Sequence, residues 1–192
     1  PLAFGSSRRP RRQPKKKKRK KAPGPSRLAD APNRQRGVDD KYWAQRFHYF
    51  SLYDCGIQLD AESWYSVTPE KIALAIATRC RPTDVVVDAF CGCGGNAIAL
   101  ARRCRHVIAI DIDAAKVEKA RRNARIYGVA VDFVVGDALV LMKTLRADVC
   151  FLSPPWGGPG YGEDFRLEAI DVQGVDGFGL LRLAAACAPR VA

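Results

Sequence analysis

The sequence predicts an α/β fold in which a parallel sheet carries helices on both faces. Short apolar strands alternate with helix-patterned segments from residue 81 onward, and strands separated by helices need crossover connections, which make parallel pairs. Glycines cluster where the first strand passes into a helix. The 155 residues from position 38 onward are about the size of one compact domain.

Each element follows from this alternation. The expected strands are Val85–Phe90, His106–Ile112, Val131–Val135 and Val149–Leu152. The expected helices cover about residues 95–104, 114–127, 138–145 and 176–187. In such sheets ligands bind beyond the carboxyl ends of the strands, so the residues that follow each strand are the candidates for a site.

The net charge of +12 is confined to the first residues of the chain. Residues 1–37 hold fourteen Lys and Arg against one acid, whereas residues 38–192 hold 18 against 19. This Pro-, Gly- and Lys-rich tail is too polar to form a core, so we expect it to be disordered. Its uninterrupted basic run, Pro14–Lys21, is typical of a nuclear import signal or a phosphate-binding patch, or else of a solvated linker.

Composition excludes several classes of protein. No apolar run reaches the roughly 18–20 residues that cross a bilayer, and the basic start lacks the apolar stretch of a secretory signal, so we expect a soluble intracellular protein without a membrane partner. The seven cysteines are an odd number and favour reduced thiols over a disulfide framework. Cys91 and Cys93 lack a second ligand pair, so no metal site is predicted.

Residues 38–80 form a predicted helical and aromatic extension before the core of residues 81–192. Tyr42, Trp43, Phe47 and Phe50 are spaced as on one helix face, which favours core or lid packing. Thr68 is expected to cap a helix that has Pro69 as its first residue and that ends near Arg79.

The first three strands end in residues suited to a nucleoside. In the segment Asp88–Ala97, Gly92 and Gly94 allow close approach of a ligand to the backbone, a pattern that also fits a nicotinamide dinucleotide. Asp111 ends the second strand and is placed to accept hydrogen bonds from ribose hydroxyls. Asp137 follows the third strand, where an adenine contact and ordinary turn chemistry are both open.

The fourth strand ends in Ser153-Pro154-Pro155-Trp156, a motif that a dinucleotide-binding fold does not require at this point. The motif suits methyl transfer to an exocyclic base amine, a poor nucleophile whose lone pair turns outward when its N–H groups are held by acceptors. The Ser153 hydroxyl and the Pro154 carbonyl are the expected acceptors, and Trp156 offers a stacking surface. The alternative is a buried indole that merely caps a strand.

These motifs together resemble the trimethylguanosine synthase family of RNA cap guanine-N2 methyltransferases. The resemblance rests on Asp88–Asn96, Ile110–Asp113 and Phe151–Pro159, and extends upstream through Lys41–Arg46 and Trp64–Glu70, so that it covers about residues 38–188. It implies the class I S-adenosylmethionine-dependent methyltransferase fold. It also implies double methylation of the guanine 2-amino group of 7-methylguanosine caps on small nuclear and nucleolar RNAs.

The resemblance also implies roles for single residues. Expected contacts to the S-adenosylmethionine cofactor come from the strand ends and the glycine loop, at Asp88, Gly92, Gly94, Asn96, Asp111 and Asp137. Ser66, Thr68 and Pro69 match a cofactor lid, with Ser66 also turned to the substrate. The expected substrate contacts are Pro155, Trp156 and Lys41. Trp156 matches the ring that stacks on the cap, and Lys41 matches a position that faces the cap phosphates. Cys93 departs from the family, which has a small apolar residue there.

Further expectations concern the partners, the location and the extent of the chain. We expect capped small nuclear and nucleolar RNA as substrate and the import machinery as a partner of Pro14–Lys21. The expected location is the nucleus, including the nucleolus or Cajal body, and also the cytoplasm. Because the family's sheet continues with further strands and an antiparallel hairpin after Cys187, we expect the 192 residues to be a fragment with an exposed sheet edge.

Two alternatives to the cap enzyme stay open. One is another exocyclic-amine methyltransferase acting on RNA, DNA or a protein glutamine, since such enzymes share a Pro-Pro-aromatic motif. The other is a catalytically silent RNA-binding or coactivator module. The upstream segments Lys41–Arg46 and Ser66–Glu70 favour the cap enzyme.

Overall fold

A computed structural model describes residue 34 and residues 37–156 and 166–192 of the chain. Its centre is a four-stranded parallel sheet in the order β3-β2-β1-β4. The strands are β1 (Val85–Asp88), β2 (His106–Asp111), β3 (Asp132–Val135) and β4 (Val149–Phe151). All four expected strands are present with ends within two residues of the prediction.

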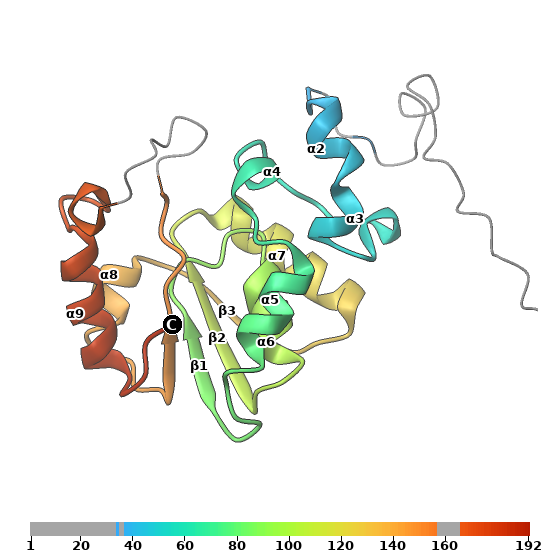
Figure 1. Cartoon of the computed structure of the whole chain (residues 1–192). Coiled ribbons are helices and arrows are strands. Elements are labelled where there is room, and N and C mark those ends of the chain that lie inside the picture. The colour runs from blue at the N-terminus through green and yellow to red at the C-terminus, as the bar shows by residue number, and fades with distance from the viewer. Residues whose placement is uncertain (1–33, 35–36, 157–165) are drawn as a thin grey trace, which may run out of the picture.

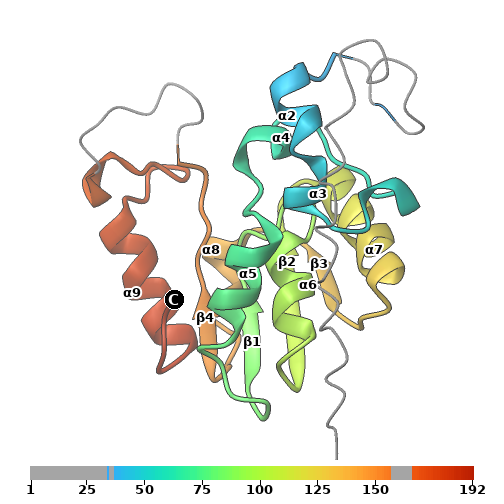
Figure 2. The same cartoon turned by 45° about the vertical axis from the view of Figure 1, so that its right-hand side comes forward.

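Helices cover both faces of this sheet, as the sequence predicted (Figure 1). One face packs against α5 (Glu70–Ala77), α6 (Gly95–Ala101) and α7 (Ala114–Tyr127). The other packs against α8 (Ala138–Leu141) and α9 (Gly177–Cys187), with a 3-10 turn, η3 (Leu167–Ala169), before α9. The turned view in Figure 2 separates these two layers, with α9 on one side of the strands and α5 and α6 on the other.

The central strand β1 shows why the sheet takes this form. Val86 and Val87 are both fully buried although their side chains point to opposite faces of the sheet. Val86 belongs to the apolar cluster beneath α5, α6 and α7, and Val87 to the cluster beneath α8 and α9. A continuous apolar run of this kind is typical of a parallel strand covered on both faces.

The start of α5 differs from the prediction. Pro69 has an extended ψ of 136° and is the N-cap, so the first helical residue is Glu70. Thr68 does not cap the helix, because its hydroxyl oxygen accepts a hydrogen bond from Asn96 Nδ2 at 3.0 Å instead. This contact ties the segment before α5 to the first turn of α6.

The ends of the other helices follow local chemistry. Asp113 caps α7 by accepting from the backbone N–H groups of Ala115 and Lys116, and Gly128 ends it with φ of 66°. This helix matches the predicted residues 114–127. In contrast α8 ends at Leu141, four residues before the prediction, because Lys143 N and Thr144 N donate to the carbonyls three residues back, Val140 O and Leu141 O.

The N-terminal extension contains α2 (Asp40–Ala44), α3 (Arg46–Tyr49), the 3-10 turn η1 (Tyr53–Cys55) and α4 (Ser63–Ser66). Its core is aromatic: the rings of Trp43, Tyr53 and Trp64 contact one another with centroids 5.4–6.0 Å apart. The expected single helix face is interrupted at Gln45, which separates α2 from α3. Phe47 is consequently half-exposed, while Phe50 is buried.

The last residues of the chain pair with the sheet. The backbone N–H of Cys150 donates to Arg190 O at 2.9 Å, and the backbone N–H of Leu152 donates to Ala192 O at 2.8 Å. These bonds make a parallel bridge between Cys150 and Val191. The edge of β4, expected to be exposed, is therefore covered by residues 190–192.

Among the described residues, no helix has both the length and the apolar character needed to span a bilayer. The cysteines are free thiols. The basic run Pro14–Lys21 lies outside the described residues.

Candidate active site

The carboxyl ends of the strands open into a cavity of about 1070 Å³. Its lining comes from the loops after all four strands, from the extension around α4, and from the turn before α9. Ten of the expected site residues line it: Ser66, Thr68, Gly92, Asn96, Asp111, Asp137, Ser153, Pro154, Pro155 and Trp156. Residues more than 80 positions apart in the sequence are thus brought to one site.

The glycine loop between β1 and α6 depends on two left-handed residues. Gly92 has φ of 52° and Gly94 has φ of 91°, a region that favours glycine. A Cβ on Gly94 would also lie 3.1 Å from Ala120 Cβ on α7, so glycine is required there for packing as well. Gly94 does not line the cavity but sets the close approach of the loop to α7.

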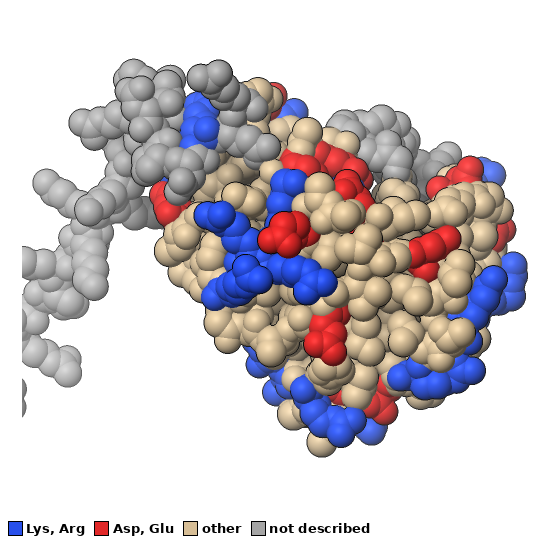
Figure 3. Space-filling view, turned by 180° about the vertical axis from the view of Figure 1, so that it is seen from behind, with Lys and Arg blue, Asp and Glu red and all other residues tan. Residues whose placement is uncertain are grey.

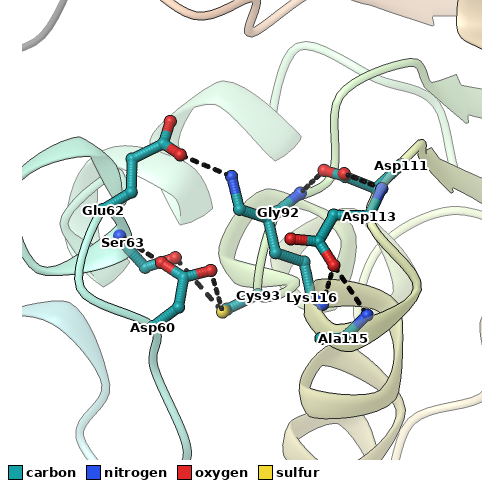
Figure 4. Close-up of polar contacts among 9 residues, drawn as sticks. All are labelled: Asp60, Glu62, Ser63, Gly92, Cys93, Asp111, Asp113, Ala115 and Lys116. Atoms are coloured by element: carbon teal, nitrogen blue, oxygen red, sulfur yellow. Dashed lines mark hydrogen bonds and ion pairs between the residues drawn. The ribbon is translucent and has the colours of Figure 1, made fainter.

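Asp111 fixes this loop against the end of β2. One carboxylate oxygen accepts from Gly92 N at 2.8 Å, and the other accepts from Asp113 N at 2.9 Å (Figure 4). Because a carboxylate oxygen can accept more than one hydrogen bond, Asp111 keeps the capacity to accept from a ligand. The carboxylate is therefore oriented before any ligand binds.

Two further acceptors beside the loop are buried without partners. Asp88 is fully buried, and neither of its carboxylate oxygens has a hydrogen-bond partner among the described residues; the same holds for Asn96 Oδ1. The pKa of Asp88 is raised to about 7, mainly because the side chain is buried. The backbone amide of Phe90 opposes this shift, and the negative charge of Asp111 adds to it. Asp88 lies behind the lining rather than in it, whereas Asn96 lines the cavity.

The loop cysteines are buried thiols. Burial is the main cause that raises the pKa of Cys91 above its ordinary value and the pKa of Cys93 to about 11. Cys93 Sγ accepts a hydrogen bond from Ser63 Oγ at 3.1 Å. The unusual cysteine of the glycine loop is thus a contact between the core and the extension.

Asp137 shows the turn chemistry that was one of the two roles the sequence left open to it. Its Oδ1 accepts from Leu139 N at 2.8 Å and so caps α8. The residue also lines the cavity. The turn chemistry is observed, and the position suits a ligand contact as well.

A wall that sequence reasoning missed closes the cavity on the side of the extension. Lys116 Nζ on α7 lies 2.7 Å from Glu62 Oε2, at the start of α4, and both residues line the cavity (Figure 4). Burial works against the charge of Lys116, but the hydrogen bond and charge of Glu62 outweigh it and raise the lysine pKa. This ion pair joins the extension to the core across the cavity.

A second link between these parts is the buried amide of Asn123. Its Nδ2 donates to Gln58 O and to Cys93 O, each at 2.9 Å, and its Oδ1 accepts from Gln58 N at 2.9 Å. Asn123 is fully buried. One side chain of α7 therefore connects the glycine loop to the extension.

Residues 153–156, which follow β4, form one wall of the cavity, and we call them the acceptor wall. Ser153, Pro154 and Pro155 line the cavity, and Trp156 lines it with 44% of its surface exposed. The indole is therefore not buried as a plain strand cap would be, and its position suits stacking. Residues 157–159 of the motif lie outside the described residues.

Besides Asp88 and Gly94, two further expected site residues, Lys41 and Pro69, stand apart from the lining. Lys41 is exposed, with Nζ 4.0 Å from Asp39 Oδ2 and 4.7 Å from the centre of the Tyr42 ring. Tyr42 itself lines the cavity. Pro69, the N-cap of α5, is not part of the lining.

The turn before α9 supplies lining residues that no motif indicated. Asp171, Val172 and Gln173 line the cavity. Gln173 has φ of 54° and Gly174 φ of 80°, within a tight turn closed by Val172 and Val175. A non-glycine residue with positive φ is uncommon, and Gly174 is the one local sign of a turn that the sequence offers there.

Fold and site together define a methyltransferase of the class I fold, with a glycine loop after β1, a carboxylate after β2 and an acceptor motif after β4. Residues 83–191 match the family described as RNA cap guanine-N2 methyltransferase, and the chain belongs to this family.

Two yeast relatives agree with this assignment. The trimethylguanosine synthase of Schizosaccharomyces pombe is 47% identical over 63% of this chain and 55% of its own length. That of Saccharomyces cerevisiae is 36% identical over 63% of this chain and 42% of its own. The chain thus spans about half the length of these relatives.

A solved structure supports the fold alone. A hypothetical protein of Thermus thermophilus is 19% identical and superposes with a TM-score of 0.50 over 67% of this chain and 72% of its own.

Proposed function

We propose that this chain transfers methyl groups from S-adenosylmethionine to the guanine 2-amino group of 7-methylguanosine RNA caps. Two transfers would give 2,2,7-trimethylguanosine, on small nuclear and nucleolar RNAs. The observation that carries the proposal is a single cavity that has the glycine loop with Asp111 on one wall and Ser153–Trp156 on another. Membership of the cap methyltransferase family supports it.

The residues present fit such a cofactor. Asp88, Asn96 and Asp111 gather carboxylate and amide oxygens around the glycine loop, and unpartnered buried acceptors favour a ligand that brings donors. S-adenosylmethionine has an ammonium group and two ribose hydroxyls, and when bound it supplies an electrophilic sulfonium methyl group. Asp111 would accept from the ribose, and Asn96 with Asp88 would favour the positive end of the amino acid moiety.

The acceptor wall prepares the amine for attack. The lone pair of the guanine 2-amino group is delocalised into the ring, so the group is a poor nucleophile until its N–H bonds are held in place. The Ser153 hydroxyl and the Pro154 carbonyl accept those hydrogen bonds, and the rigid proline backbone keeps the acceptors fixed. Orientation of this kind lowers the barrier because the reacting atoms are already in line.

Trp156 provides selectivity for the methylated cap. A guanine methylated at N7 carries a positive charge, which strengthens its stacking on an electron-rich indole. Stacking of a base on an aromatic side chain is worth about 1–3 kcal/mol. An unmethylated guanine lacks the cationic part of this stabilisation.

The experiment is methyl transfer from labelled S-adenosylmethionine to the cap dinucleotide m7GpppG, compared with GpppG and with uncapped RNA. The proposal expects label in m7GpppG alone, together with calorimetric binding of the cofactor and none of NAD. Transfer to uncapped RNA would indicate another amine methyltransferase instead. Binding of cofactor and cap without transfer would indicate a silent binding module.

For location we propose the nucleus, through recognition of Pro14–Lys21 by import factors. The support is the charge distribution of the sequence, which places fourteen basic residues and one acid in residues 1–37.

A further inference from the structure

We propose that the outer face of α7 is a second RNA site, which holds the phosphate backbone of the substrate behind its cap. The face is formed by Lys119, Arg122 and Arg125, and we call it the α7 basic face. The proposal rests on the proposed function, since it assumes that the substrate at the cavity is the end of a longer RNA.

Cations gather on this side of the molecule. Seen from behind, one cluster of Lys and Arg lies near the middle of the view with acidic residues between and above it, and further cations lie along the lower and right-hand edges (Figure 3). Residues 114–127 contain five cations and one acid, Glu118, although residues 38–192 as a whole hold 18 basic and 19 acidic residues. Residues 114–127 therefore carry a net charge of +4, whereas residues 38–192 as a whole carry −1.

The three cations of the α7 basic face are not held in ion pairs with carboxylates of the described residues. Elsewhere arginines are paired with acids, as Arg46 is with Asp54 and Arg190 with Asp84. In the part of the chain that the structure describes, Lys119, Arg122 and Arg125 make no ion pair of this kind. Arg122 and Arg125 are exposed, so their guanidinium groups are available to phosphate.

The face is connected to the cavity by the helix itself. Lys116, in the first turn of α7, lines the cavity, and Arg125 lies nine residues further along. At 1.5 Å per residue this is about 13.5 Å, the length of about four phosphates at the 3.4 Å rise of a stacked strand. Arg122 Nε donates to Gly56 O at 3.2 Å, which places this cation at the junction with the extension.

The chemistry of the face favours RNA over a protein partner. None of the large apolar residues that are exposed in the described part of the chain lies on α7, whereas protein interfaces have an apolar, desolvated centre. Phosphate contacts need only cations and donors, and they release counterions when they form. A row of Lys and Arg without apolar neighbours meets that requirement.

The test is binding of a fluorescent uncapped RNA of about 16 nucleotides, longer than the face, measured by anisotropy with the full chain. In R122Q/R125Q the slope of log affinity against log salt should decrease by about 1.4, at about 0.7 per phosphate contact. Between about 50 and 200 mM salt the wild type should then lose about sevenfold more affinity than the variant. The basic tail is the same in both proteins, so the difference reports on α7.

Two further variants sharpen the result. K143Q/R146Q removes two positive charges at the same sequence spacing from the segment after α8, where both residues are exposed, and should leave the slope unchanged. E118Q removes the acid from the α7 basic face and should strengthen RNA binding. Equal slopes in wild type and R122Q/R125Q, or an equal change in K143Q/R146Q, would overturn the proposal.

The outcome is separable from that of the proposed function. Binding of uncapped RNA requires no methyl transfer, so it is measured whether or not the chain methylates caps. If the chain methylates m7GpppG, R122Q/R125Q should leave the KM for this dinucleotide unchanged and raise the KM for a long capped RNA. A rise in both values would place the two arginines in the cap pocket and contradict a separate face.

Discussion

Replacement of Asn123 by alanine should destabilise the protein more than replacement of any other single amide of the site. The side chain is fully buried and makes three hydrogen bonds of 2.9 Å, two with Gln58 and one with Cys93 O. A net contribution of about 0.5–1.5 kcal/mol for each bond gives about 1.5–4.5 kcal/mol. Since the Gln58 contacts are only partly buried, we expect about 2–3 kcal/mol.

The assay is urea unfolding followed by circular dichroism, with Gln45→Ala as the control. Gln45 is exposed and its Nε2 donates to Lys41 O at 3.1 Å, so this change should cost less than about 0.5 kcal/mol. Asn123→Ala should also weaken cofactor binding, because Cys93 is in the glycine loop. A loss below about 1 kcal/mol in Asn123→Ala would refute the reasoning, since the three bonds would then be replaced by water at no cost.

Four further predictions concern the site and the tail. Trp156→Ala should lower cap affinity by about 5- to 150-fold in a fluorescence titration and leave cofactor affinity intact; equal loss of both would mean a structural indole. Because the pKa of Asp88 is raised to about 7, the folded state binds more protons than the unfolded state between about pH 4 and 7, and the free energy of unfolding should fall as pH rises through that window. Asp88→Asn should abolish this fall, and an unchanged pH profile would contradict it. A double-mutant cycle on Glu62 and Lys116 should give a coupling of about 0.5–1 kcal/mol in stability, whereas zero coupling would mean that packing alone holds the extension. Deletion of residues 1–37 should displace the protein from the nucleus and weaken salt-sensitive RNA binding; unchanged localisation would leave the run as a plain linker.

The sheet and the strand-end motifs were predictable because they depend on local patterns. Continuous apolar runs such as Val85–Asp88 indicate buried strands, and the residues after them meet at one edge in any parallel sheet. Thus Asp111 and Ser153 are found in one cavity although they are 42 positions apart.

The wall formed by the extension was not predictable from such patterns. Glu62 and Lys116 are ordinary surface residues by type, and only tertiary packing brings them within 2.7 Å. The same holds for Asn123, whose amide resembles any polar position of a helix until Gln58 is folded against it. Thr68 shows the opposite error: its sequence position favours a cap, but Asn96 competes successfully for its hydroxyl.

The proposed function requires that this cavity directs methyl transfer to N2 of a 7-methylguanosine cap. Its most direct test is mass spectrometry of the nucleosides released from m7GpppG after incubation with the chain and S-adenosylmethionine. We expect 2,7-dimethylguanosine followed by 2,2,7-trimethylguanosine, with both products strongly reduced when Ser153-Pro154 is replaced by Ala-Ala, which removes the hydroxyl and the rigid ring. A methyl group at any other atom, or unmodified m7GpppG recovered from a protein that binds both the cofactor and the cap, would contradict it.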